Sequence, residues 1–173
     1  IKEVKRIGKH AQGTIAYTTS PVHNLDTWLD LAKKIEDSGA DSLAIKDMAG
    51  LLRPFDAYDL VKSLKETLSI PIHMQTHATT GMSPATNMKA IEAGIDNIDT
   101  SISSLSMTYG HTATETMLAI FEGKDRYLNL DLDALEEVST FFKDIREKYS
   151  EFEGNLKGVD STMLVKQGPG GML

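Results

Sequence analysis

Three polar side chains recur at every second position of the apolar segment 70–77, which predicts a β-strand. On an extended strand His73, Gln75 and His77 point to the same face. His73 and His77 would lie roughly 13 Å apart, at about 3.3 Å per residue, so they cannot bind one metal ion together. The natural ligand pair is Gln75 and His77, in which Gln75 offers an amide oxygen, a weaker ligand than an imidazole. We expect His73 to be buried and hydrogen-bonded, and His77 to act in a site.

A lysine occupies a comparable place at the end of another predicted strand, because Lys46 directly follows the apolar run 43–45. A lysine amine that is partly withdrawn from water can act as a base, form a Schiff base or take up carbon dioxide as a carbamate. The carbamate would supply an anionic oxygen ligand to a metal. A structural ion pair of Lys46 with Asp47 or another carboxylate is the alternative.

Two further segments are weaker candidates. The hydroxyl cluster 100–104 could bind substrate oxygens, although turn and capping roles explain it at least as well. The glycine-rich segment 168–171 lacks the strand-to-helix context of a phosphate-binding loop, so we predict a turn there.

Strand, loop and helix alternate roughly every 30 residues, the length of a βαβ unit, which requires a parallel sheet covered by helices. Either a doubly wound sheet or a (β/α)8 TIM barrel fits this pattern. A complete barrel takes about 200 residues or more, so a barrel here would be its C-terminal part, about strands 4–8. The predicted strands are 13–19, 42–45, 70–77, 95–102 and 162–166, and the predicted helices begin after Asn24 and near Pro54 and span 83–93, 112–121 and 131–149.

The composition excludes several classes of protein. The chain has 173 residues, of which 40% are hydrophobic and 25% charged, with a net charge of −7 and no cysteine. We therefore expect no membrane insertion, no nucleic-acid partner, no thiolate chemistry and a cytoplasmic location. The chain begins at Ile1 without a methionine and ends on a turn-like string, so we expect residues 1–173 to be one partial domain, truncated at both ends.

Several segments together resemble the carboxyltransferase domain of biotin-dependent enzymes. This family includes pyruvate carboxylase, the oxaloacetate decarboxylase alpha subunit and the transcarboxylase 5S subunit, and it folds as a (β/α)8 barrel. The segments that carry the resemblance, in order and at matching spacing, are 45–52 (IKDMAGLL), 71–77 (PIHMQTH), 79–81 (TTG), 90–94 (AIEAG), 99–106 (DTSISSLS), 109–115 (YGHTATE) and 167–173 (QGPGGML).

The resemblance implies a divalent metal, commonly zinc, manganese or cobalt. Its ligands would be an Asp on the first barrel strand, a carbamylated Lys and two His spaced His-x-His. The Lys corresponds to Lys46 and the second His to His77, whereas the first His falls on Gln75, a departure that should weaken metal binding and could change the preferred ion. Substrate-binding residues from earlier strands, and a Thr beyond the barrel, lie outside this chain.

The resemblance also implies an activity, which is metal-assisted carboxyl transfer between a keto acid such as oxaloacetate or pyruvate and biotin. The biotin would sit on a separate carrier domain or subunit, because this chain has no Met-Lys-Met acceptor sequence. We expect a homo-oligomeric enzyme with Lys46 as a catalytic residue, and we expect this chain alone to be inactive. The alternatives are a metal-dependent lyase or aldolase-type barrel of the hydroxymethylglutaryl-CoA lyase kind, and a noncatalytic segment in which Gln75 records the loss of metal.

Overall fold

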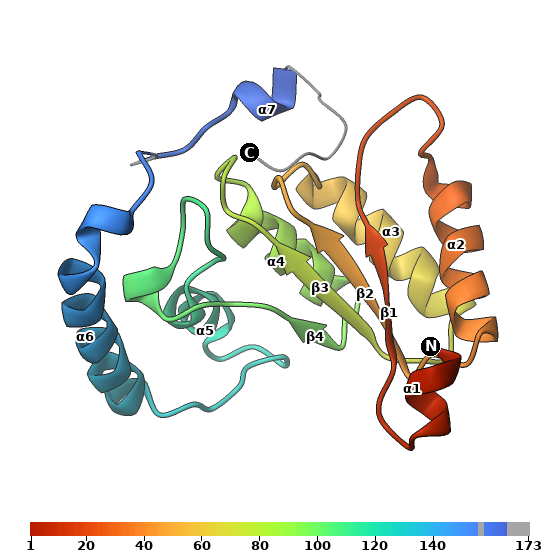
Figure 1. Ribbon diagram of the computed structural model, residues 1–173, viewed down its shortest axis with the longest axis horizontal. Coiled ribbons are helices and arrows are strands. Elements are labelled where there is room, and N and C mark those ends of the chain that lie inside the picture. The colour runs from red at the N-terminus through yellow and green to blue at the C-terminus, as the bar shows by residue number, and fades with distance from the viewer. Residues whose placement is uncertain (156–157, 166–173) are drawn as a thin grey trace.

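A computed structural model describes residues 1–155 and 158–165 of the chain (Figure 1). Its centre is a four-stranded parallel sheet in the order β1-β2-β3-β4. The strands are β1 (Gln12–Ala16), β2 (Ser42–Asp47), β3 (Ile72–Thr76) and β4 (Asn97–Ile98). Each strand pairs with the next one along the chain, so successive strand-to-helix loops lie side by side at one edge of the sheet.

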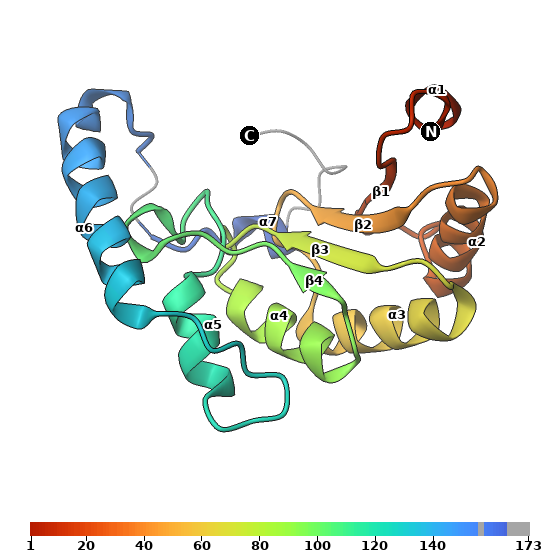
Figure 2. The same cartoon turned by 90° about the horizontal axis from the view of Figure 1, so that it is seen from below.

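Helices connect the strands and cover one face of the sheet. Figure 2 shows α3, α4 and α5 on one side of the strands, and the part of the chain that the structure describes places no comparable helix layer on the other side. The helices are α1 (Lys2–Arg6), α2 (Leu25–Asp37), α3 (Pro54–Thr67), α4 (Ser83–Glu92), α5 (Thr114–Phe121), α6 (Leu132–Lys148) and α7 (Thr162–Val165), with short 3-10 turns η1 (Ser103–Leu105) and η2 (Ser150–Phe152).

Local sequence chemistry explains the helix boundaries. The side chain of Asn24 accepts a hydrogen bond from the Thr27 backbone N–H at 3.0 Å and caps α2. Gly39, at φ +86°, follows the end of that helix, as glycine commonly does. Pro54 stands in the first turn of α3, where its missing N–H costs nothing. These boundaries confirm the predicted helices.

The core lies between the sheet and its helices. Leu43, Ile45, Ile72 and Met74 are completely buried and face α3 and its neighbours, as the period of two along a strand requires. The intervening residues of β2 and β3 point to the other face, which we call the open face. Parallel sheets are normally covered on both sides, and in a closed barrel this second face is the interior.

The C-terminal part corrects one prediction. Residues 162–166 are predicted as a fifth strand, but Thr162–Val165 form the helix α7, and Lys166 lies outside the described residues. The Asp160 carboxylate accepts a hydrogen bond from the Thr162 backbone N–H at 2.9 Å, a capping arrangement that favours a helical turn over a strand. The described sheet therefore has four strands, about half of an eight-stranded barrel.

The long helix predicted over 131–149 is confirmed as α6, which lies at the far end of the molecule from α1 (Figure 1). Apolar residues, among them Val138 and Phe141, recur at helical spacing along α6, but no residue of α6 is buried, and these two are exposed. None of the helices among residues 1–155 and 158–165 is long and apolar enough to cross a membrane. The predicted turn at 168–171 lies outside the described residues.

Candidate active site

Lys46, Gln75 and His77 come together at the carboxyl ends of β2 and β3. Lys46 and Gln75 are partners in the parallel register, and His77 follows Gln75 by two residues on the same side. All three side chains are half-buried on the open face. The predicted grouping of these three residues agrees with this placement, which is also where barrel enzymes carry their chemistry.

His77 is held in one tautomer by the loop that follows β4. Its Nδ1 lies 2.6 Å from the backbone carbonyl oxygen of Tyr109, which can only accept, so Nδ1 carries the proton. In the neutral ring the lone pair is then on Nε2, which faces the Gln75 amide nitrogen at 3.4 Å. The His111 ring packs against His77 with 4.7 Å between ring centroids. Burial, and then the neighbouring His77, lower the pKa of His111. The arrangement leaves the lone pair of His77 Nε2 on the side of Gln75.

His73 has a different role from His77. Its Nε2 lies 2.7 Å from an Asp99 carboxylate oxygen, and its register partner in β2 is Ala44 rather than Lys46. The predicted hydrogen bond of His73 is confirmed, although the side chain is half-buried rather than fully buried, with 26% of its surface exposed. The pair joins β3 to the segment after β4.

The alternative interpretation of Lys46, an ion pair with Asp47 or another carboxylate, is not seen among the described residues. The two side chains leave β2 on opposite faces, and Asp47 is completely buried on the helix side. Its carboxylate accepts hydrogen bonds from the backbone N–H groups of Leu51 and Leu52, both at 2.9 Å, and from the Thr76 hydroxyl at 3.0 Å. Burial nevertheless raises the pKa of Asp47. Asp47 therefore shapes the loop after β2, and the Lys46 amine is left for the open face.

A second loop contact sets the backbone beneath His77. Gly50 adopts φ +66°, and a Cβ built on it would lie 2.6 Å from the His77 carbonyl oxygen. The Thr80 hydroxyl donates to the Gly50 carbonyl at 2.5 Å and ties the two loops together. Only glycine allows this close approach. The segment 47–52 therefore packs directly against the backbone of the loop that begins at His77 and supports it.

These residues fit a divalent metal with an oxygen-rich ligand set. His77 offers a nitrogen lone pair, Gln75 offers its amide oxygen once the amide is turned over, and Lys46 offers an oxygen only as a carbamate. Residues 1–155 and 158–165 contain no group of three His, Cys, Asp or Glu side chains placed to hold a metal ion. Gln75 offers an amide oxygen where a His-x-His pair has its first imidazole, and an amide oxygen is the weaker ligand for zinc-like ions.

The hydroxyl cluster 100–104 serves mainly to build the loop after β4. The Ser103 backbone N–H donates to Glu115 at 3.1 Å, and the Ser103 hydroxyl lies 2.8 Å from that of Ser139 on α6. Thr100 bonds to Thr114 in the same way, at 2.8 Å. The turn and capping interpretation thus explains these contacts.

The site residues that sequence reasoning missed are Tyr109 and His111. Tyr109 acts through its backbone carbonyl, which leaves no mark in the sequence. His111 could have been noticed as the fifth histidine of the sequence, in the loop that follows β4.

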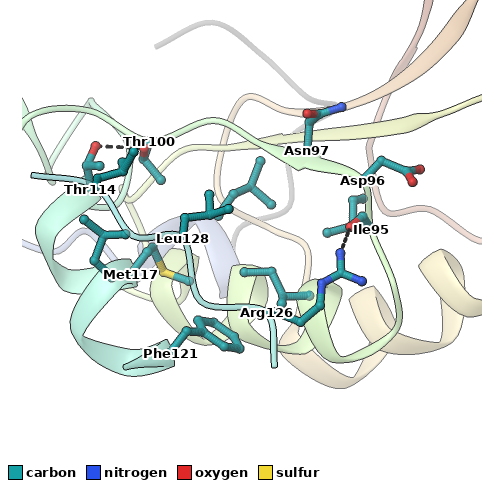
Figure 3. A pocket seen from close by; sticks show the side chains of 13 residues that line it. Ile95, Asp96, Asn97, Thr100, Thr114, Met117, Phe121, Arg126 and Leu128 are labelled. Atoms are coloured by element: carbon teal, nitrogen blue, oxygen red, sulfur yellow. Dashed lines mark hydrogen bonds between the residues drawn. The ribbon is translucent and has the colours of Figure 1, made fainter. Parts of the chain in front are cut away.

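A cavity of about 260 Å³ lies on the helix side of β4, away from these residues (Figure 3). Its lining is mostly apolar and includes Ile95, Met117, Phe121 and Leu128. The Arg126 guanidinium donates to the Ile95 carbonyl at 2.5 Å and closes one side. Thr100 of the hydroxyl cluster lines this cavity, but Lys46, Gln75 and His77 do not, so the cavity is separate from these three residues.

The sheet is parallel, helices cover one of its faces, and the polar residues lie at the carboxyl ends of the strands. This arrangement is that of part of a (β/α)8 barrel. The sequence model of the HMGL-like family matches residues 1–142. The chain belongs to the HMGL-like family.

Individual relatives narrow this assignment. The chain is 48% identical over 172 residues to the methylmalonyl-CoA carboxyltransferase 5S subunit of Propionibacterium freudenreichii subsp. shermanii, an alignment that covers 98% of this chain and 34% of that protein. It is 46% identical over 174 residues to a pyruvate carboxylase subunit of Methanocaldococcus jannaschii, covering 100% of this chain and 31% of that protein. The chain thus spans about a third of the length of these curated relatives.

A solved structure agrees with both relatives. The carboxyl transferase domain from Rhizobium etli pyruvate carboxylase with pyruvate and biocytin superposes with a TM-score of 0.93 at 32% identity, covering 98% of this chain and 29% of that chain. The predicted resemblance to carboxyltransferase domains is confirmed, and so is the predicted partial barrel.

Proposed function

We propose that the protein containing this chain transfers a carboxyl group between a keto acid, of the oxaloacetate or pyruvate type, and biotin carried by a separate domain or subunit. The observation that carries the proposal is the likeness to a carboxyl transferase domain that was solved with pyruvate and biocytin. The identities to subunits of a carboxyltransferase and of a pyruvate carboxylase support the same reaction class.

Lys46, Gln75 and His77 are the residues we propose for a divalent metal, which we take to be zinc, manganese or cobalt. Support comes from their shared position at the carboxyl ends of two neighbouring strands and from the outward Nε2 of His77. When bound there, the metal would polarise the keto acid carbonyl and stabilise the negative charge that develops on its oxygen. The chain's own contribution is to hold His77 in one tautomer, to offer the Gln75 oxygen, and to place the Lys46 amine where it can be carbamylated.

We also propose that residues 1–173 form one part of a barrel domain whose other strands come from the rest of the protein. The uncovered face of the sheet and the unpaired outer edges of β1 and β4 in the described structure support this. A chain with half of its barrel would be inactive alone. The absence of cysteine suits a cytoplasmic enzyme, and we propose a homo-oligomer that works with its biotin carrier.

The test is oxaloacetate-dependent pyruvate release by the full-length protein, measured with and without free biotin and accompanied by metal analysis. Carboxyl transfer predicts release that depends on biotin and on a stoichiometric metal. Release that is indifferent to biotin would indicate the lyase or aldolase-type alternative. Metal below about a tenth of an equivalent would remove the metal assignment and favour a noncatalytic segment.

A further inference from the structure

The loop between β4 and α5 has an uncommon backbone. Met107 and Thr108 are consecutive residues with positive φ, +62° and +50°, a conformation that residues other than glycine rarely adopt. Hydrogen bonds close the turn from within, from Met107 N–H to the His111 carbonyl and from Gly110 N–H to the Met107 carbonyl, both at 2.7 Å. Such strain persists only where the surroundings over-determine it.

This turn delivers three contacts to the start of the loop after β3. The Tyr109 carbonyl accepts from His77 Nδ1 at 2.6 Å, and the Gly110 carbonyl accepts from the Ala78 backbone N–H at 2.9 Å. The His111 ring covers one side of His77. The strained turn thus fixes both the backbone and the ring of His77.

Contacts from outside the sheet hold the turn in place. On α6, the Arg146 Nη1 donates to the Ser104 carbonyl at 2.9 Å, while its Nε pairs with Glu153. The Ser103–Ser139 contact described above adds a second tie to α6. A guanidinium can make these two directed contacts at once because its donors form a rigid fork.

We infer that Arg146 is a positioning residue for His77, acting through the loop 103–111. The inference rests on the proposed function, in which His77 has to present Nε2 to a metal. Arg146 contacts the Ser104 carbonyl and Glu153, not His77 itself. It fixes Ser104, the turn then fixes the Tyr109 carbonyl, and the carbonyl keeps the proton on Nδ1. This gives α6, whose own residues are never fully buried, a role in the site.

The test is Arg146→Met in the full-length, metal-free protein, read by nitrogen NMR of labelled histidine in mildly alkaline buffer. The His77 signals are assigned by their loss in His77→Asn. Wild type should show the Nδ1–H tautomer, and Arg146→Met should show a mixture of tautomers. Zinc titration should give an affinity lowered in proportion to the fraction of His77 in the wrong tautomer, about twofold for an equal mixture.

Arg6→Met is the matched control, because it also removes an Arg Nε–Glu pair, with Glu3 at 2.7 Å, from a fully exposed helix. It should leave the His77 tautomer and zinc affinity unchanged. Arg146→Lys keeps the positive charge but lacks the guanidinium fork, so it should shift the His77 tautomer in the same direction as Arg146→Met, but less. If Arg146→Met does not fold, the tautomer of Arg146→Lys tests the inference.

A wild-type tautomer in the folded Arg146 variant would overturn the inference. The tautomer is measured without metal, so a wild-type protein that binds no zinc would overturn the proposed metal site and leave the positioning result to be judged separately.

Discussion

Lys46 and Gln75 are register partners across the β2–β3 pair, and both side chains point to the open face of the sheet. This adjacency places Gln75 beside Lys46 in the proposed metal site. An amide oxygen is a poorer ligand than an imidazole for zinc-like ions, so Gln75 should limit the zinc affinity of this site. We expect Gln75→His to raise zinc affinity by about tenfold, equivalent to about 1.4 kcal/mol. Equilibrium titration of the metal-free protein with zinc measures it.

His73→Gln is the control for that experiment. His73 lies on the same face, but its Nε2 is engaged by Asp99 at 2.7 Å, and its register partner is Ala44. Its loss should leave zinc affinity unchanged. An unchanged affinity in Gln75→His, or a fall in His73→Gln, would place the metal elsewhere.

Lys46→Arg should abolish the carbamate, since a guanidinium stays protonated and does not take up carbon dioxide. Zinc affinity and oxaloacetate-dependent pyruvate release should each fall by about 100-fold, or about 2.7 kcal/mol. The unfolding temperature should not change, because the half-buried Lys46 makes no ion pair in the described structure. Lys34→Arg, on the exposed side of α2, is the control. Full activity in Lys46→Arg would contradict a carbamate role.

The lowered pKa of Glu36 predicts that the protein loses stability as the pH falls into the acid range. Hydrogen bonds from Lys33, and then from the Ser69 hydroxyl and backbone N–H, lower the pKa of Glu36 to about 2. A carboxylate whose pKa is depressed on folding stabilises the protein above its ordinary pKa, and that contribution disappears as the pH falls through the depressed value. Glu36→Gln should therefore lower the unfolding temperature at neutral pH, and the difference from wild type should shrink between about pH 4.5 and about pH 2.

Glu92→Gln is the control, because it removes an ion pair of the same i,i+3 spacing, with Lys89 on α4. The Glu92 carboxylate has 44% of its surface exposed and accepts no backbone hydrogen bond in the described part of the chain. The substitution should change the unfolding temperature little at any pH. A difference for Glu36→Gln that is constant with pH would show that the effect comes from packing and not from ionisation.

Local rules explain why much of this fold is predictable from sequence. Asn24 and Pro54 mark helix starts through contacts within a single turn, so no tertiary information is needed. The period of two along β3 places His73, Gln75 and His77 on one face, and their half-burial between fully buried neighbours agrees with it. These signals depend on residues a few positions apart.

The failures depend on distant or backbone groups. The Tyr109 carbonyl that orients His77 could belong to any residue type, so the sequence carries no signal for it. The segment 162–166 has the apolar and β-branched composition of a strand, but residues 162–165 are helical. The Asp160 carboxylate accepts from the Thr162 backbone N–H, and the Asp160 N–H donates to the Thr79 carbonyl at 2.8 Å, and neither contact could be read from the composition. On α6, Val138 looks like core by periodicity and is exposed because nothing in the described structure covers it.

Gly50→Ala tests the support beneath His77. The new Cβ would meet the His77 carbonyl oxygen at 2.6 Å and the Thr80 hydroxyl at 3.1 Å, at a backbone φ of +66°. We expect a loss of about 1–3 kcal/mol in the free energy of unfolding, together with weaker zinc binding, because the His77 backbone has to move.

Gly39→Ala separates backbone strain from that contact. Gly39 has φ +86°, but a Cβ there meets nothing within 4 Å, so only the strain applies. Denaturant unfolding of both variants, followed by zinc titration, makes the comparison. Gly39→Ala should be destabilised without any change in zinc affinity, whereas Gly50→Ala should lose both stability and zinc affinity. Equal destabilisation with unchanged zinc binding in both variants would mean that the loop 47–52 does not position His77.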